Sequence, residues 1–374
     1  MLLTLGVVGA ALLALTWIVY PALIIVAGNL ARTIRKAPAD VPDASLPTVT
    51  VIVATRDAPA LVEARVLDIL ASAYPAQLLE VIVAVDARAE AVSPESLTLP
   101  AGRARAVRGD EPGGKCPTLN AGVRAATSDV IAFTDTHQRF DALALRRMVC
   151  ALITRGYGAT SGRLLLPRDS DSSLVRRYTQ YELLIRDGEA QIHSAVGVSG
   201  SVFSMWRSLW QPLPDGLILD DLYTPMRLVL AGHRIGFQRD AIAHETRMVV
   251  PSQEYRRKVR TLTGNLQLCA WLPSVLLPVR NPIWLQFVCH KLLRLVTPYG
   301  VALVGIAVVG EVIVRLGDRL PFALGAAVVA GAWVALGRDS LSRRVRSLVI
   351  QGASLQAAVV TATGNAIRGR WNVW

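Results

Sequence analysis

The sequence predicts an α/β protein with a mostly parallel sheet and helices on both of its faces, joined to transmembrane and interfacial helices. Short apolar runs rich in β-branched residues alternate with helical patterns over roughly 200 residues. These runs end on carboxylates. The chain is also 52% hydrophobic with a mean hydropathy of +0.40, which is too apolar for an ordinary soluble enzyme. We therefore expect a soluble domain that is attached to a membrane.

The first predicted element is a transmembrane helix at residues 1–30. Residues 2–28 carry no charge, and about 20 apolar residues cross the hydrocarbon core. A signal peptide is the competing interpretation, but the basic residues Arg32, Arg35 and Lys36 follow the apolar run in place of a cleavage site. By the positive-inside rule, they put the N-terminus outside and the next segment in the cytosol. We expect an integral protein of the plasma (inner) membrane.

The net charge of +12 at pH 7 comes from basic residues that are scattered or lie beside apolar segments, without interleaved aromatic residues. This pattern favours membrane lipids and nucleotide phosphates as partners and predicts no nucleic-acid binding. The four cysteines show no metal-ligand spacing, so we expect reduced thiols.

The cytosolic domain is predicted over residues 48–250, after a linker at residues 31–47. Apolar runs at 49–54, 79–85 and 130–133 read as strands, with helical patterns between them. The carboxyl ends of parallel strands form the edge of a sheet where ligands bind. Polar side chains follow all three runs, which predicts a nucleotide site at that edge.

Two of these strand ends carry groups that suit a nucleotide and a metal. Asp86 follows the second run, and Asp135 and His137 follow the third. An Asp oxygen and a His nitrogen two positions apart can hold one divalent cation, here Mn²⁺ or Mg²⁺. The alternative is that the aspartates cap turns or helices and that His137 is a surface residue.

The glycine-rich stretch at 109–116 nearly matches a phosphate-binding loop. It has Gly109, then four residues, then Gly114 and Lys115. However, Cys116 stands where a Ser or Thr hydroxyl would hold magnesium, which excludes an ATPase of that type.

In this order, Thr55-Arg56-Asp57, Asp86, the Gly-Lys-x-x-x-Leu-Asn run at 114–120 and Asp135-Thr136-His137 resemble the nucleotide-sugar half of family-2 inverting glycosyltransferases. Residues 197–201, Asp220-Asp221 and 253–257 resemble the acceptor half of that family. The likeness is to membrane-bound relatives of cellulose, chitin and hyaluronan synthases and covers roughly residues 48–300. Each motif is weak by itself, but six in the right order are a strong signal. The resemblance implies the GT-A fold, a Rossmann-like sheet.

The resemblance also implies roles for residues at the matching positions. It implies donor binding by Thr55, Arg56, Asp57, Asp86, Lys115, Asn120, Asp135, Gln253, Arg256 and Arg257. It implies acceptor contacts by Ser199, Gly200 and Ser201, and a metal on Asp135 and His137. By the register of the motif, Asp221 is the base and Asp220 its neighbour.

Two positions depart from the family pattern. The metal motif usually reads Asp-x-Asp, whereas His137 stands at its third place and binds Mn²⁺ or Mg²⁺ less tightly than a carboxylate does. The gate motif usually reads Gln-x-x-Arg-Trp, whereas Arg257 replaces the Trp and removes a ring that would stack on the acceptor sugar.

The residues of the predicted acceptor half also have purely structural interpretations. Asp220 and Asp221 precede a helical pattern, where a carboxylate is either a base kept ionised by the helix dipole or simply a cap. The basic residues at 253–260 share one predicted helix and face either the diphosphate or lipid headgroups. A lone His244 is more often structural than a metal ligand.

The C-terminal third is predicted to be membrane-associated. Residues 251–296, with Pro, Trp and basic residues, predict amphipathic interface helices, and 297–336 predict two transmembrane helices. A basic loop and a re-entrant or interfacial helix follow at 337–374.

The expected function is transfer of a sugar from a nucleotide-sugar donor, a UDP-sugar by resemblance, to a growing glycan or lipid-linked acceptor at the cytosolic membrane face. Inversion would give a β-linkage, as in polysaccharide biosynthesis. The alternatives are a single-addition transferase acting on a lipid carrier and a non-catalytic membrane scaffold with a degenerate nucleotide site. With about three spans, a polymer would need a homo-oligomeric pore or a separate exporter.

Overall fold

The computed structural model describes residues 1–34, 40–167, 173–247 and 251–372. Two compact units divide the chain. One comprises Met1–Ala22, Pro251–Leu266 and Val288–Trp374, and the other comprises Leu23–Val250 and Gln267–Phe287. The second unit contains the sheet, so we call it the sheet unit and the first the helical unit. Residues 35–39 of the predicted linker, which include Arg35 and Lys36, lie outside the described residues.

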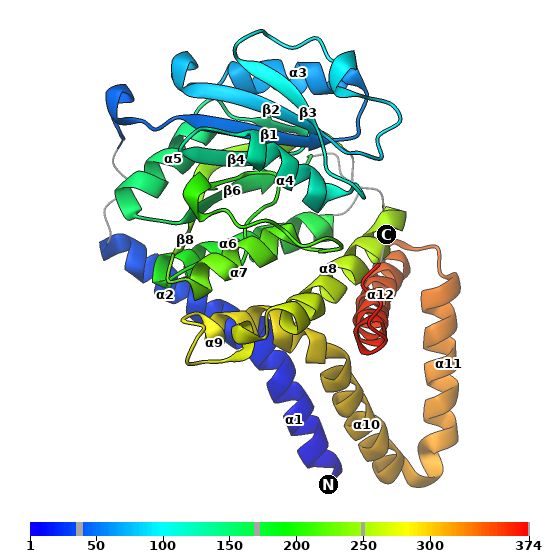
Figure 1. The fold of residues 1–374 in the computed structure, drawn as a ribbon. Coiled ribbons are helices and arrows are strands. Elements are labelled where there is room, and N and C mark those ends of the chain that lie inside the picture. The colour runs from blue at the N-terminus through cyan, green and yellow to red at the C-terminus, as the bar shows by residue number, and fades with distance from the viewer. Residues whose placement is uncertain (35–39, 168–172, 248–250, 373–374) are drawn as a thin grey trace. The chain divides into compact units, whose positions relative to one another are not determined.

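An eight-stranded sheet forms the centre of the sheet unit (Figure 1). Its spatial order is β3-β2-β1-β4-β7-β6-β8-β5. The strands are β1 (Val49–Thr55), β2 (Leu79–Val85), β3 (Ala104–Arg108), β4 (Val130–Thr134), β5 (Gln138–Phe140), β6 (Ala159–Leu165), β7 (Phe203–Trp206) and β8 (Ile235–Glu245).

The strands β3, β2, β1 and β4 are parallel, and the sequence predicts a mostly parallel sheet. β1 pairs in parallel with β2 and β4, β2 with β3, and β6 with β8. β7 runs antiparallel to β4 and β6, and β5 runs antiparallel to β8. The sheet is therefore mixed, and its antiparallel strands lie in the half that follows β4.

Helices cover both faces of the sheet because alternate strand residues point to opposite sides. Val51 and Val53 of β1 join the core cluster with Val62 and Val66 of α3 (Pro59–Leu70). Ile52 points the other way, where α4 (Lys115–Ala125) packs so closely that a Cβ at Gly122 would lie 2.8 Å from Ile52 Cγ2. The remaining helices that lie wholly or mostly in this unit are α2 (Tyr20–Ile34), α5 (Ala144–Arg155), α6 (Ser173–Ile192), α7 (Asp220–Leu230) and α9 (Trp284–Phe287). Its short helical turns are η2 (Asp43–Ser45), η3 (Ala76–Leu78), η4 (Pro94–Ser96), η5 (Arg207–Leu209) and η6 (Pro273–Leu276).

The described part of the predicted linker packs against the sheet unit. Val41 and Leu46 are buried in the core cluster. Arg146 of α5 lies 3.1 Å from a carboxylate oxygen of Asp40 and 2.5 Å from one of Asp43. The described linker residues are thus fixed to the domain rather than loose, which its prolines alone do not reveal.

The described part of the helical unit consists of helices and short helical turns. They are α1 (Leu2–Ala14), η1 (Leu15–Val19), α8 (Pro251–Trp271), η7 (Val288–Leu292), η8 (Leu293–Val296), α10 (Thr297–Leu316), η9 (Gly317–Arg319), α11 (Leu320–Leu336) and α12 (Ser340–Ile367). Small residues let α1 and α10 pack closely, since a Cβ at Gly9 would lie 2.7 Å from the carbonyl oxygen of Gly300. Tyr255 of α8 hydrogen-bonds Thr361 of α12 through the two hydroxyls at 2.9 Å.

Three helical stretches among the described residues are long and apolar enough to cross a membrane: Leu2–Ile34, Trp284–Leu316 and Ser340–Ile367. The first two contain the predicted N-terminal helix and the first predicted C-terminal span. The second predicted C-terminal span, α11, is a shorter apolar helix. The third stretch falls where the sequence predicts a re-entrant or interfacial helix, and its length and composition also permit a crossing.

Candidate active site

Three predicted donor carboxylates, Asp57, Asp86 and Asp135, lie along one edge of the sheet. The last residues of β1 and β2 are in register, as Thr55 pairs with Val85, and β4 ends beside β1, where Val53 pairs with Thr134. Asp86 and Asp135 each follow their strand directly, and Asp57 follows β1 after one residue. The carboxylates therefore gather at the carboxyl ends of parallel strands, as expected for a ligand site.

Asp86 is held in a glycine-lined turn. Its Oδ1 accepts hydrogen bonds from the backbone N–H of Arg88 at 3.0 Å and of Gly114 at 2.9 Å. Gly113 has φ +80°, and a Cβ there would lie 2.7 Å from Asp86 Oδ1, so glycine is required. Burial alone would raise the pKa of Asp86, but these hydrogen bonds and the nearby charges of Arg88 and Arg56 hold it below its usual value. Asp86 is thus a fixed, ionised acceptor.

Lys115, the first residue of α4, joins both halves of the site. Its Nζ lies 3.2 Å from Asp220 Oδ2 and 4.0 Å from Asp135 Oδ1. Burial opposes the charge, but the carboxylates of Asp220, Asp135 and Asp221 raise the pKa of Lys115 above its usual 10.5. The ammonium therefore stays protonated at neutral and mildly alkaline pH. A fixed cation between a strand-end carboxylate and the start of α7 suits a diphosphate.

The predicted acceptor loop at 199–201 packs against the start of α7. A Cβ at Gly200 would lie 3.3 Å from both Asp221 Cβ and Lys115 Nζ, so this position is crowded. Ser199 N–H donates to Ser161 Oγ at 2.9 Å, and Ser201 is buried. The structure thus brings Gly200, Lys115, Asp220 and Asp221 together.

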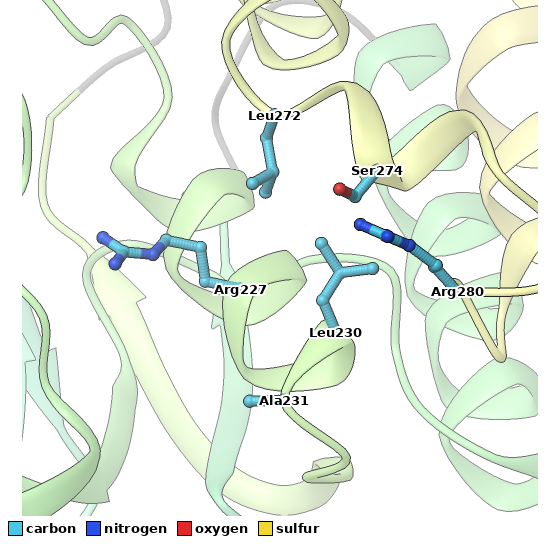
Figure 2. Close-up of a pocket in the computed structure, with 6 residues that line it drawn as sticks. All are labelled: Arg227, Leu230, Ala231, Leu272, Ser274 and Arg280. Carbon is cyan, nitrogen blue, oxygen red and sulfur yellow. The ribbon is translucent and has the colours of Figure 1, made fainter.

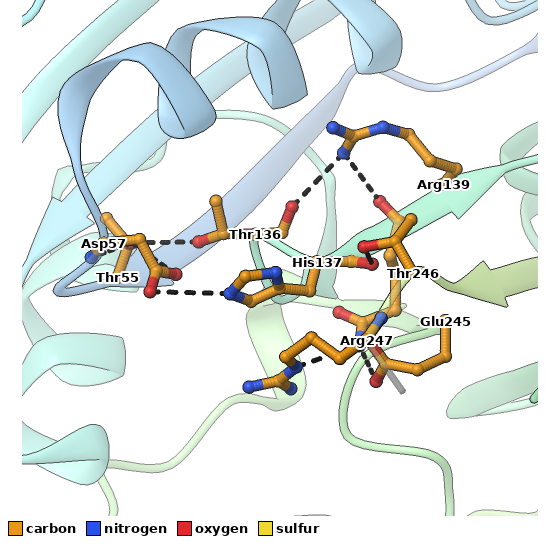
Figure 3. Close-up of polar contacts among 9 residues, drawn as sticks. Thr55, Asp57, Thr136, His137, Arg139, Glu245, Thr246 and Arg247 are labelled. Atoms are coloured by element: carbon orange, nitrogen blue, oxygen red, sulfur yellow. Dashed lines mark hydrogen bonds and ion pairs between the residues drawn. The ribbon is translucent and has the colours of Figure 1, made fainter. Parts of the chain in front are cut away.

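His137 contacts Asp57 across the strand ends (Figure 3). Its Nε2 lies 3.5 Å from Asp57 Oδ1. The neighbouring pair is also bonded, since Thr136 Oγ1 lies 2.9 Å from Thr55 Oγ1, and Thr55 Oγ1 accepts from Asp57 N–H at 3.0 Å. The loops after β1 and β4 are therefore held together by these contacts, one of which is made by His137.

Residues 47–264 match the family model described as glycosyltransferase like family 2, which spans more than half of the chain. The chain belongs to this glycosyltransferase family. A solved structure of the mannosyltransferase PcManGT from Pyrobaculum calidifontis, in complex with GDP-Man and Mn²⁺, is similar with a TM-score of 0.69 and 21% identity. The likeness covers 97% of this chain and 99% of that chain. At this identity it shows the fold, a GT-A-like mixed sheet. No curated protein sequence matches the chain.

Two further predicted donor-binding residues of this glycosyltransferase, Asn120 and Arg56, contact other residues of the chain. The Asn120 amide is bound at both ends by Leu213, because its Nδ2 donates to Leu213 O and its Oδ1 accepts from Leu213 N–H, both at 2.8 Å. Asn120 thereby fixes the loop before α7, and a direct donor contact would require this pair to open. Arg56 is exposed, with Nε 4.0 Å from Asp86 Oδ2, and so is available to a ligand beside Asp86.

The predicted gate residues lie on α8. Arg256 and Arg257 are exposed there, while the side chain of Gln253 lies outside the described residues. The basic helix that the sequence predicts is confirmed as an element. Donor binding by Gln253, Arg256 and Arg257 stays a prediction.

Sequence reasoning missed the residues that hold the loop after β4 from behind. Thr246 donates to the backbone carbonyl of His137 from N–H at 2.9 Å and from Oγ1 at 2.7 Å (Figure 3). Gln138 Nε2 donates to Glu245 Oε2 at 2.7 Å. Glu245 is the last residue of β8 and Thr246 directly follows it. Both are roughly 100 residues further on, so no local pattern pointed to them.

Arg65 of α3 was also missed. Its side chain is fully buried and lies over the Phe140 ring at 4.4 Å, with Nη2 donating to Thr134 Oγ1 at 2.9 Å. Burial lowers its pKa to about 10, against the opposing charge of its ion-pair partner Asp68. It thus supports the residue that directly precedes Asp135. In the sequence it is one more arginine on a helix, and only its burial reveals the role.

A divalent metal would be held by Asp135 together with substrate groups, rather than by a preformed cluster of protein ligands. Among the described residues, no three His, Cys, Asp or Glu side chains are grouped to hold a metal ion. Asp135 is 35% exposed, and Mg²⁺ is commonly held by one or two carboxylates together with substrate phosphates and water. His244, the other histidine considered, pairs with Asp141 at 2.9 Å.

Proposed function

We propose that the protein is an inverting glycosyltransferase that moves a sugar from a nucleotide-sugar donor to a growing glycan or a lipid-linked acceptor at the cytosolic membrane face. One observation carries the proposal. Lys115 lies within 4.0 Å of Asp135 at the strand ends and of Asp220 at the start of α7. Diphosphate-side and acceptor-side groups therefore meet at one point, which a displacement at the anomeric carbon requires.

The roles follow from the charges. Asp221, beside Gly200, takes the proton of the attacking acceptor hydroxyl, whose oxygen forms a bond to the anomeric carbon while the bond from that carbon to the diphosphate breaks. Lys115 offsets the negative charge that grows on the leaving diphosphate. Asp220 is buried and paired with Lys115, which suits a positioning residue rather than the base. Attack from the side opposite the diphosphate inverts the anomeric centre and gives a β-linkage from an α-linked donor.

Two donors are candidates. The sequence resemblance favours a UDP-sugar, bound with Asp57 and Asp86 toward the nucleoside. The similar solved mannosyltransferase holds GDP-Man, which makes GDP-mannose the second candidate.

Asp135 is the residue that would hold a divalent metal, with Mn²⁺ suggested by that same complex. A bound metal would neutralise charge on the diphosphate. The chain's own contribution is to hold the Lys115 ammonium 4.0 Å from Asp135 Oδ1, so that a cation stands next to the carboxylate.

The membrane part of the proposal rests on three helical stretches, among the residues described, that are long and apolar enough to span a membrane. With the N-terminus outside, the sheet unit would face the cytosol, where nucleotide sugars are made. The acceptor would then reach the site from the inner membrane surface. A single addition to a lipid carrier is the alternative within the same chemistry.

The test is mass analysis of products from the purified protein. It is offered a panel of UDP- and GDP-sugars with membrane lipid extract as the acceptor source. One added hexose or a hexose ladder, made with one donor and lost in Lys115→Met, supports the proposal. Nucleotide binding without product from any donor would favour the non-catalytic scaffold instead.

A further inference from the structure

The segment between α8 and α9 is a firmly folded turn. Val275 and Ile283 are fully buried. Buried Asn281 closes the turn, since its Nδ2 donates to Val275 O at 2.8 Å and its Oδ1 accepts from Ile283 N–H at 3.1 Å. Trp284 Nε1 donates to Leu276 O at 2.9 Å. The outer residues of this turn are therefore held in place by its inner ones.

Those outer residues are apolar and exposed. Leu276 is 40% exposed, Leu277 45% and Val279 92%. A fixed group of exposed apolar side chains is typical of a surface that meets a membrane or a partner. The candidate span Trp284–Leu316 begins four residues after Arg280, so chain continuity keeps this turn near the point where the chain would enter a membrane. Lipid is accordingly the occupant that fits.

A hollow of about 480 Å³ lies beside the turn (Figure 2). Its lining residues are Arg227, Leu230, Ala231, Leu272, Ser274 and Arg280. The guanidinium of Arg280 and the hydroxyl of Ser274 point toward each other next to Leu230, while the guanidinium of Arg227 points away from them. The hollow thus offers two hydrogen-bond donors against an apolar wall.

The two arginines differ in how they are bound. Arg227 Nη1 donates to Pro212 O at 3.4 Å, and its guanidinium lies 5.5 Å from the centre of the Tyr223 ring. Arg280 has no hydrogen-bond or ion-pair partner for its guanidinium among the residues that the structure describes. Arg280 is therefore the cation available to a ligand.

We infer that this hollow binds the phosphate of an anionic phospholipid, with Arg280 and Ser274 on the phosphate oxygens and the acyl chains beside Leu276, Leu277 and Val279. The guanidinium fork matches phosphate oxygens. Basic residues next to exposed apolar ones are the pattern of a surface that lies on an anionic membrane. The site docks the sheet unit onto the membrane.

The lipid site is distinct from the proposed acceptor site. Asp221 and Leu230 are nine residues apart on α7, which at 1.5 Å per residue is roughly 14 Å. A lipid phosphate at Arg280 is thus beyond the hydrogen-bond reach of the proposed base. Removing Arg280 should leave nucleotide binding at the sheet edge unchanged.

Native mass spectrometry of the full chain in a non-ionic detergent tests the inference. The probes are phosphatidylglycerol, phosphatidylcholine and glycerol 3-phosphate, which carries the phosphate without acyl chains. Wild type should retain phosphatidylglycerol most tightly. Arg280→Ala should weaken phosphatidylglycerol binding about tenfold, because a hydrogen-bonded charge is lost. Ser274→Ala should weaken this binding less, and Arg280→Lys should weaken it least.

Arg105→Ala is the matched control, because Arg105 is an exposed arginine on β3 that hydrogen-bonds the carbonyl oxygen of Ala125, and it should bind lipid as wild type does. Unchanged affinity for a nucleoside diphosphate shows that Arg280→Ala is folded. Equal phosphatidylglycerol retention by wild type and Arg280→Ala would overturn the inference. So would glycerol 3-phosphate binding as tightly as phosphatidylglycerol, since the site would then take a free phosphate compound.

Discussion

Asp221 is the residue on which the proposed chemistry depends most. Asp221→Asn keeps the shape of the side chain but removes the base, so we expect turnover to fall by about 10²-fold or more. Affinity for the nucleoside diphosphate should stay within a few-fold, because Lys115 and Asp135 remain. Steady-state kinetics and calorimetric titration measure the two quantities. Asp240→Asn, at an exposed carboxylate on β8, is the control, and near-normal turnover in Asp221→Asn would reduce Asp221 to a helix cap.

A metal titration distinguishes the role of Asp135 from the role of His137. We expect nucleoside diphosphate binding to be weaker in chelator and restored by Mn²⁺ or Mg²⁺, and Asp135→Ala to remove this metal dependence. His137 lies beside Asp57, so His137→Ala should weaken binding by the same factor with and without metal. Weakening only in the presence of metal would make His137 the ligand that the sequence motif predicts. Binding of equal strength in chelator and in metal, for wild type, would exclude a metal on the diphosphate.

The site residues that the sequence revealed are those whose chemistry is local. Lys115 and Asp135 stand in recognisable runs at element ends, and the structure brings them together with Asp220. Arg65 and Thr246 act through partners on other elements, and such contacts leave no trace in a single sequence. Asn120 lies on α4, and its contacts with Leu213 depend on a loop whose path no pattern predicts.

At the scale of elements, α2 is fixed to α6 through glycines. A Cβ on Gly28 would overlap Gly188 Cα, and a Cβ on Gly188 would lie 2.5 Å from Ile24 O. Asp187, next to Gly188, forms ion pairs with Arg32 of α2 and Arg239 of β8. Gly28→Ala should therefore push the helices apart and cost roughly 1–3 kcal/mol. The melting temperature of the purified protein is the measurement.

Gly305→Ala is the control for this crossing, because a Cβ there meets nothing within 4 Å. Alanine in an open helical position is neutral or stabilising. A melting temperature that falls equally in both variants, or in neither, would show that the close approach of α2 and α6 contributes nothing to stability.

The strands that the sequence predicted are the buried parallel ones, β1, β2 and β4, whose continuous apolar runs are unmistakable. β8 was not predicted because its middle residues, Gln238, Arg239 and Asp240, are polar. They interrupt the apolar alternation of a strand as well as the apolar spacing of a helix. β5 has only three residues, too few for any pattern. The parallel strands β1, β2 and β4 were therefore predictable from the sequence, whereas the part of the sheet that β8 forms with β5 and β6 was not.

At the scale of the whole molecule, the part of the chain that the structure describes contains three helical stretches long and apolar enough to span a membrane. Three helices are too few to enclose a water-filled path for a polar polymer, whose exposed polar groups are costly in hydrocarbon. We therefore expect a single copy to make oligosaccharide or lipid-linked product without exporting it. In vesicles with one outward-facing copy each, product should remain open to an added glycosidase. Protected, lipid-free polymer would mean that the C-terminal helices line a channel.

The central claim, an inverting sugar transfer by the full chain, is tested most directly by the anomeric configuration of the product. Purified protein is given the donor that yields product, with an α-linked sugar labelled with ¹³C at the anomeric carbon, and the product is examined by NMR before any mutarotation of free sugar. The account predicts a β-linkage in the transferred sugar from the first turnover. An α-linkage would contradict it, because retention requires chemistry other than a single displacement with Asp221 as base.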